Sequence, residues 1–293
     1  MKKNQVNVLF LLFILLSCNA KSTDATSPAG NDSIPEGAVP FEYDFKMKKQ
    51  IMIPGTLNDS IPMLYMLETG ITTPVFSDGL NFKSNSSLFE DVDAPMKIRI
   101  GNWEKTYGDT ANPASYADKS QSTSNNMNLL FEWYGDSAAY IPGLFFKDKI
   151  IEISFSKLYI REIEDVSGLS GFDIIKMEYE NHRFGIPVVI YAQGKEIKET
   201  LLFDTGFNGP ITYNRDIKIK YNMEDDYVPS DKVDTVKIGN NYLTDDIYFG
   251  FLPENRSHKA PFSGLMGTQV LQNFDIVLDL KNYYLYLKPV SHK

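Results

Sequence analysis

The hydrophobic pattern of this chain consists mainly of short segments with strand character, separated by turn-forming residues. Two of them, 149–163 and 184–203, are rich in β-branched and aromatic residues. Two others, 234–252 and 273–289, each predict a pair of strands joined by a tight turn that contains asparagine. Helical periodicity is scarce, so we expect a mostly β fold. Short helices are predicted only near residues 126–135 and 268–273.

Three short motifs occur twice along the chain, in the same order. Each half carries a carboxylate followed by Thr-Gly, then Ile-Gly-Asn, then an apolar segment that ends in glycine before a long pair of strands. The motifs lie at 68–70 and 204–206, at 100–102 and 238–240, and at 141–143 and 265–267. One such match could arise by chance, whereas three in order indicate an internal duplication.

The duplication predicts two similar β-barrel lobes related by a pseudo-two-fold axis. We place the N-terminal lobe at residues 41–165 and the C-terminal lobe at residues 176–293. A linker is expected at residues 166–175, where glycine and serine are frequent. In this arrangement Glu68 and Asp204 would face each other across the axis.

The first 18 residues have the pattern of a secretory signal peptide. Lys2 and Lys3 precede an apolar run that ends in Leu-Leu-Ser-Cys, and this run is short for a membrane-spanning helix. The ending resembles a bacterial lipoprotein signal, in which Cys18 becomes the lipid-bearing first residue of the mature protein. The alternative is an ordinary signal peptide with an incidental cysteine. The lipoprotein interpretation predicts a chain anchored to a lipid bilayer through acyl groups on Cys18.

Residues 19–40 predict a disordered tether between the lipid and the folded part of the chain. They are rich in Ser, Thr, Asn, Gly and Pro, and they can bury little apolar surface. In bacterial lipoproteins, an aspartate directly after the lipidated cysteine often signals retention in the inner membrane. This chain has Asn19 at that position. The expected location is therefore the cell envelope, at the outer membrane rather than the inner one.

Composition argues against several classes of function. The chain has 293 residues and a net charge of -9, and we expect no nucleic-acid partner, because phosphate binding requires a positive surface. Its three histidines, His182, His258 and His292, are far apart in sequence, and its single cysteine lies in the predicted signal peptide. These residues do not complete a thiolate–histidine site, so no metal and no other cofactor is expected.

The two carboxylate motifs suit a pair of acids that shares one proton. Asp204 follows an apolar run, as expected at the end of a buried strand, and Glu68 has the same setting. Two carboxyl groups about 3 Å apart do not both ionise, so one can take a proton from water while the other donates to a peptide carbonyl. Threonine can hydrogen-bond across the junction, and glycine allows close backbone approach. The expected supporting residues are Thr69, Gly70, Thr205 and Gly206.

These motifs resemble those of the retropepsin-like and pepsin-like aspartic proteases. The resemblance rests on Leu-Phe-Asp-Thr-Gly-Phe at 202–207 and on Leu-Met-Gly at 265–267, and it covers both lobes, about residues 41–289. It implies a bilobed β fold with a substrate cleft between the lobes and a hairpin flap over the cleft. It also implies that Asp204 and Glu68 are the catalytic dyad. The apolar-glycine segments that would pack beneath them contain Leu265, Met266 and Gly267 in the second lobe and Gly143 in the first.

The first lobe departs from the family pattern in two places. Glu68 stands where the family has aspartate, and its extra methylene moves the carboxylate by about 1.5 Å. A misplacement of about 1 Å can cost roughly 10²-fold in rate, so a slow enzyme is expected unless the backbone has adjusted. In the apolar-glycine segment, Pro142 lacks a backbone donor. The flap is assigned to the hairpin that carries Tyr107 and Gly108.

The sequence favours an aspartic endopeptidase that hydrolyses peptides or proteins. The alternative is a catalytically inactive lipoprotein that binds peptides or serves as a scaffold on the same fold, because a fold alone does not establish an activity. In a third arrangement, Asp204 of two molecules would form a symmetric dyad. The covalently attached first lobe is the nearer partner at high effective concentration, so we expect a monomer.

Overall fold

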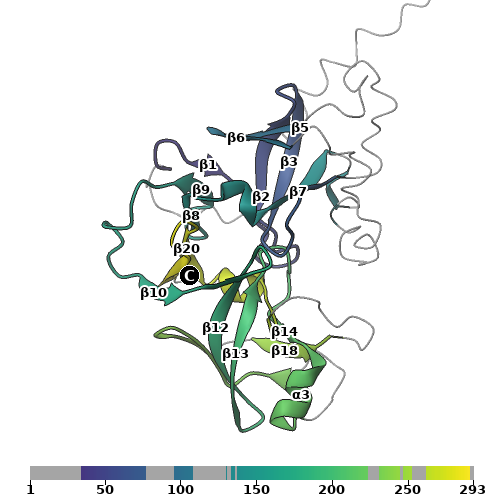
Figure 1. The fold of residues 1–293 in the computed structure, drawn as a ribbon, viewed down its shortest axis with the longest axis vertical. Coiled ribbons are helices and arrows are strands. Elements are labelled where there is room, and N and C mark those ends of the chain that lie inside the picture. Colours follow the sequence, from purple (N-terminus) through teal and green to yellow (C-terminus); the bar gives the residue numbers. More distant parts are fainter. Residues whose placement is uncertain are drawn as a thin grey trace, which may run out of the picture. The chain divides into compact units, whose positions relative to one another are not determined.

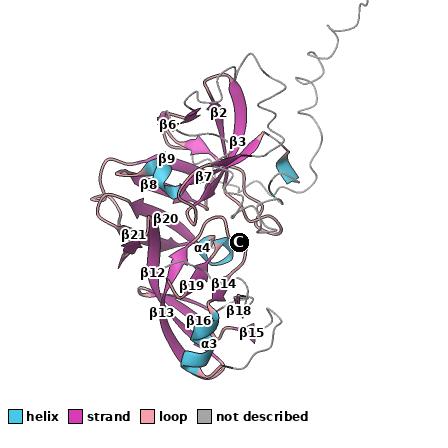
Figure 2. Cartoon of the chain, turned by 45° about the vertical axis from the view of Figure 1, so that its right-hand side comes forward, coloured by secondary structure: helices cyan, strands magenta, loops and turns pink. Residues whose placement is uncertain are grey.

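The computed structural model describes residues 34–76, 96–107, 130, 133–135, 137–223, 231–244, 247–252 and 262–290. The predicted signal peptide with Cys18, most of the predicted tether, and Gly108 of the predicted flap lie outside these ranges. Across the described ranges, strands predominate and the helices are short (Figure 2). None of the helices in these ranges is long and apolar enough to cross a membrane.

The first half of the chain forms a six-stranded sheet with the order β4-β7-β3-β2-β5-β6. Strands β2 and β3 form an antiparallel hairpin, and β3 runs parallel to β7, with Glu68 in register with Pro142. The parallel pair matters for the site, because β3 ends at Glu68. The strands are β2 (Met52–Leu57), β3 (Ile61–Glu68), β4 (Val75–Phe76), β5 (Met96–Ile100), β6 (Trp103–Tyr107) and β7 (Ala138–Pro142).

The second half repeats this strand order as β14-β19-β13-β12-β16-β17. Strands β12 and β13 form the hairpin, and β13 runs parallel to β19, with Phe203 in register with Met266. The chain is thus mostly β, and its two halves share one pattern of strand pairing, which confirms the predicted pair of similar β lobes. The strands are β12 (Arg183–Ala192), β13 (Lys195–Phe203), β14 (Ile211–Tyr213), β16 (Thr235–Ile238), β17 (Asn241–Leu243) and β19 (Gly264–Met266), extended by β11 (Glu178–Glu180), β15 (Asp231–Lys232) and β18 (Tyr248–Phe251).

A third sheet combines strands from both halves, in the order β1-β9-β8-β20-β21-β10. Its central contact pairs β8 of the first half with β20 of the second, and Ile153 lies opposite Ile276. Figure 1 labels β1, β9, β8, β20 and β10 of this sheet. The strands are β1 (Val39–Pro40), β8 (Ile150–Ser154), β9 (Tyr159–Glu162), β10 (Asp173–Lys176), β20 (Phe274–Asp279) and β21 (Tyr284–Pro289).

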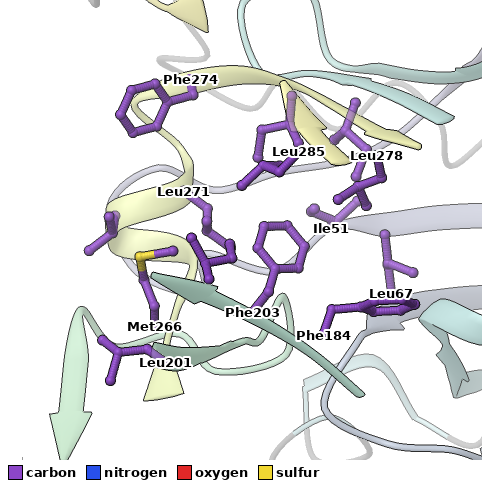
Figure 3. Close-up of a cluster of buried hydrophobic side chains, with 14 of the residues drawn as sticks. Ile51, Leu67, Phe184, Leu201, Phe203, Met266, Leu271, Phe274, Leu278 and Leu285 are labelled. Carbon is purple, nitrogen blue, oxygen red and sulfur yellow. The ribbon is translucent and has the colours of Figure 1, made fainter. Parts of the chain in front are cut away.

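The main hydrophobic core joins the three sheets beneath the ends of β3 and β13. Leu67 precedes Glu68 on β3, Phe203 precedes Asp204 on β13, and Leu278 comes from the shared sheet; all three are buried. Figure 3 shows these side chains together with Ile51 and Leu285. Because burying each large apolar side chain stabilises the fold by roughly 1.5–3 kcal/mol, this core holds both strand ends in place.

Both Ile-Gly-Asn motifs form hairpin turns, as the repeat predicts. Gly101 lies between β5 and β6, and Gly239 lies between β16 and β17. Their φ angles are 54° and 59°, a left-handed region that glycine adopts without the steric cost of a side chain. The turn at Lys281 and Asn282 likewise joins β20 to β21, which confirms the second predicted strand pair.

Several elements differ from the sequence-based expectations. Helix α3 (Arg215–Tyr221) was not predicted, because its apolar residues alternate as in a strand; in the structure Ile217 is buried and Ile219 is 82% exposed. Two expected connecting segments contain strands, since β1 pairs with β9 and β10 pairs with β21. The chain also contains the 3-10 helix η2 (Gly143–Phe146) and, within a predicted helical region, α4 (Thr268–Leu271).

Candidate active site

Two equivalent strand ends carry the candidate acids. Glu68 is the last residue of β3, and Asp204 directly follows the last residue of β13. Each of these strands lies beside a parallel neighbour that leads into an apolar-glycine segment. The Asp204 N–H donates to the carbonyl of Met266 at 3.1 Å, so the parallel pairing continues through the acid itself. The duplication therefore places the two carboxylates at the same point of their respective sheets.

The two threonines lock the carboxylate motifs together. The Thr69 N–H donates to Thr205 Oγ1 at 3.1 Å, and the Thr205 N–H donates to Thr69 Oγ1 at 3.0 Å. Each hydroxyl then donates to a main-chain carbonyl of the opposite strand, Thr69 Oγ1 to Phe203 at 2.5 Å and Thr205 Oγ1 to Leu67 at 2.7 Å. Both side chains are buried, so these reciprocal bonds are shielded from water and fix the motifs in register.

The carboxyl groups of Glu68 and Asp204 meet above the two glycines. A Cβ atom added to Gly206 would lie 1.4 Å from Glu68 Oε2. A Cβ atom on Gly70 would lie 2.8 Å from both Asp204 Oδ2 and Glu68 Oε1. No side chain fits at either position without displacing a carboxylate. The glycines are therefore required because the space above them is filled by the acids.

Main-chain donors orient each carboxylate. The Gly70 N–H donates to Glu68 Oε1 at 2.8 Å. Asp204 Oδ1 accepts two such bonds, from Gly206 and Phe207, each at 3.0 Å. Asp204 thus accepts two main-chain bonds through one oxygen, and Glu68 accepts one through Oε1.

Burial raises the pKa of Glu68 well above its ordinary value, and the charge and the hydrogen bond of the neighbouring Asp204 raise it further. Two groups oppose this shift, the Gly70 N–H and the guanidinium of Arg183. Tyr140 of β7 also lies close enough for the charge of Glu68 to raise the pKa of its phenol, after the larger effect of burial. Burial and the neighbouring Asp204 therefore both favour the protonated form of Glu68.

The apolar-glycine segments pack beneath the motifs. A Cβ atom on Gly143 would lie 2.9 Å from Thr69 Cγ2, and one on Gly267 would lie 2.2 Å from the carbonyl oxygen of Phe207. Leu265 and Met266 pair with β13 just before Asp204. The structure thus brings together the acids and the residues predicted to support them.

The predicted flap lies only partly within the described residues. Tyr107 ends β6 and packs against the main hydrophobic core, and Gly108 lies outside the described residues. The flap assignment stays a prediction. Among the described residues, no group of three or more His, Cys, Asp and Glu side chains is placed to hold a metal ion.

Sequence reasoning missed Arg183, which begins β12 and reaches the site. Its Nε donates to the Gly70 carbonyl at 2.9 Å. The two bonded residues are 113 positions apart in the chain, and no local sequence pattern around Arg183 predicts this bond. The sequence places Arg183 and Asp204 on the two arms of one predicted hairpin. Their positions indicate that the two residues lie close together only once the register of that hairpin is known.

No protein-family model matches the sequence, and no curated protein matches it either. Among solved structures, the chain is similar to a crystal structure of an aspartic proteinase from Irpex lacteus, with 12% sequence identity and a TM-score of 0.44. The match covers 87% of this chain and 97% of that one. At this identity and TM-score, the likeness says nothing about the activity of this chain.

Proposed function

We propose that this protein is an aspartic endopeptidase whose dyad is formed by Glu68 and Asp204. The observation that carries the proposal is the junction of the two motifs, where buried threonines exchange hydrogen bonds and both carboxyl groups meet over glycine. A solvated carboxylate that only ends a strand would need neither the reciprocal bonds nor the two close glycine contacts. Such an arrangement suits two acids that share one proton.

The environments of the acids assign their roles. Glu68, whose pKa is raised, keeps the proton and donates it to the oxygen of the scissile carbonyl. Asp204, which accepts two main-chain N–H bonds, carries the negative charge and removes a proton from the attacking water. The water oxygen then bonds to the carbonyl carbon. When the tetrahedral intermediate collapses, its C–N bond breaks and the proton on Asp204 passes to the leaving amine nitrogen. One hydroxyl of the intermediate returns its proton to Glu68, which restores the pair and leaves a carboxylic acid.

The longer side chain of Glu68 is accommodated in this geometry. Its Oε2 reaches across the junction to the space above Gly206, and its Oε1 turns back to the Gly70 N–H. Both oxygens therefore have defined positions next to Asp204. The extra methylene has been absorbed by the local arrangement, which supports an active pair in which glutamate replaces one aspartate.

The anchoring of the protein is a separate part of the proposal. The pattern of residues 1–18, which ends at Cys18, supports a lipoprotein of the cell envelope, and Asn19 favours the outer membrane. A tethered monomer would act on peptides or proteins close to the bilayer. Sedimentation of the soluble part of the chain tests the monomer, since cleavage by a monomer excludes a dyad built from two copies of Asp204.

Cleavage of a peptide library from acidic to neutral pH tests the activity. The protein without residues 1–18 should generate new peptide termini, and Asp204→Asn and Glu68→Gln should abolish them, because each change removes one carboxylate while keeping its shape. Asp216→Asn is the matched control, since Asp216 is exposed on α3. Saturable peptide binding without cleavage would instead support the inactive peptide-binding lipoprotein. Cleavage at full rate by Asp204→Asn would rule out the dyad.

A further inference from the structure

We propose that Arg183 is a positioning residue of the dyad, which holds the Glu68 loop in place from the opposite half of the chain. The inference rests on the proposed function, because it assigns Arg183 a role in the same reaction. Arg183 is the first residue of β12 and follows a two-residue turn formed by Asn181 and His182. Both turn residues have positive φ angles, 49° and 62°, so a tight turn aims the chain into β12.

The strand register brings Arg183 to the level of the acids. In the β12–β13 hairpin, Gly185 lies opposite Leu202. The pairing of β12 with β13 ends there, and the two chains continue beyond it to Arg183 and to Asp204, each two residues further on. From there the side chain does not stay within its own half, because Nε donates to the carbonyl of Gly70 at 2.9 Å.

This bond fixes the residue that orients Glu68. The Gly70 N–H donates to Glu68 Oε1 at 2.8 Å, while the Gly70 carbonyl accepts from Arg183. Glycine has the widest choice of backbone dihedrals, and Gly70 is required here by the carboxylates above it. A residue that must be glycine is thus held at both its donor and its acceptor. Gly70 has no side chain that could restrict its backbone, and the hydrogen bond from Arg183 restricts it instead.

The guanidinium also brings a positive charge to the buried pair. The charged and titratable groups that act on Glu68 among the described residues are Asp204, Arg183 and Tyr140. Arg183 is the positive one of the three, and its Nε donates to a main-chain carbonyl, that of Gly70. Its charge lowers the pKa of Glu68 against the effect of burial. Arg183 therefore acts on the charge of Glu68 as well as on the position of its loop.

Two substitutions separate the contact from the charge. Arg183→Gln removes the charge, and Arg183→Lys keeps the charge but lacks the Nε donor. We expect kcat to fall about 10-fold or more in both variants, with little change in KM, because a loosened catalytic group costs rate rather than binding. Only Arg183→Gln should move the alkaline limb of the pH profile toward higher pH, because it removes the positive charge that lowers the pKa of Glu68. Arg215→Gln is the matched control, since Arg215 also donates through Nε to a main-chain carbonyl, that of Leu252, at 3.0 Å.

The effect of Arg183 on the pKa of Glu68 can be measured without any cleavage assay. In the intact protein with ¹³C-labelled glutamate, Arg183→Gln should shift the titration of the Glu68 carboxyl group to higher pH, and Arg215→Gln should leave it unchanged. If the unmutated protein cleaves no peptide, the proposed function fails and this titration still decides the role of Arg183. If the titration and kcat of both Arg183 variants match those of the unmutated protein, the role of Arg183 is refuted.

Discussion

Shortening Glu68 is the sharpest test of whether the first half has adapted to glutamate. In the structure the carboxyl group reaches the space above Gly206, contacts Asp204 and accepts the Gly70 N–H. Glu68→Asp would withdraw that group by about 1.5 Å, one carbon–carbon bond. A hydrogen bond of ordinary length does not survive such a retreat. Because a misplacement of about 1 Å can cost roughly 10²-fold in rate, kcat/KM should fall by about 10²-fold or more.

The assay compares initial rates on one cleaved peptide for the unmutated protein, Glu68→Asp and Glu68→Gln, each checked for an unchanged unfolding midpoint. Glu68→Gln should be inactive because it cannot donate and recover a proton. Glu68→Asp should retain weak activity if the backbone relaxes by a few tenths of an ångström. An increase in rate in Glu68→Asp would refute the reasoning, because it would mean that the first half is still built for aspartate.

Four further outcomes are expected. Gly206→Ala should reduce cleavage at least 10²-fold, measured as kcat/KM, because its Cβ atom would lie 1.4 Å from Glu68 Oε2 and displace that carboxylate. Thr205→Val should lower the free energy of unfolding in urea by about 2 kcal/mol, through the loss of buried hydrogen bonds. The pKa of Glu68 is higher in the folded than in the unfolded state, so the folded state loses stability as pH rises above about 4.3, where the unfolded glutamate ionises. Above that pH, the free energy of unfolding of the unmutated protein should fall relative to that of Glu68→Gln. Cys18→Ser should abolish labelling by a fatty-acid probe and release the protein from the membrane fraction; unchanged labelling would contradict the lipoprotein interpretation.

The fold could be predicted largely because the repeated motifs consist of residues with strict backbone requirements. Gly101 and Gly239 mark equivalent turns, and the carboxylate-Thr-Gly motifs mark equivalent strand ends. Both kinds of signal depend on local sterics and can be recognised without coordinates. The position of Glu68 next to Asp204 then follows from the duplication.

The features that escaped prediction depend on contacts between distant segments. Helix α3 has a strand-like alternation, yet it buries Ile217 and leaves Ile219 exposed, because tertiary packing outweighs local preference. Arg183 reaches Gly70 only after β12 and β13 have paired and the two halves have met.

The shared sheet can form only late, because its central strands come from distant parts of the chain. Strand β8 finds its partner β20 only after the chain has closed a loop of more than a hundred residues, as the pairing of Ile153 with Ile276 shows. Contacts so far apart form slowly, because the entropy of closing the loop is lost before the contact stabilises the chain. A chain that emerges from its N-terminus presents Glu68 long before Asp204. The last strands to be delivered complete the sheet beneath both acids. The pair of acids can therefore assemble only once almost the whole chain has been released, and the proposed cleavage could begin only then.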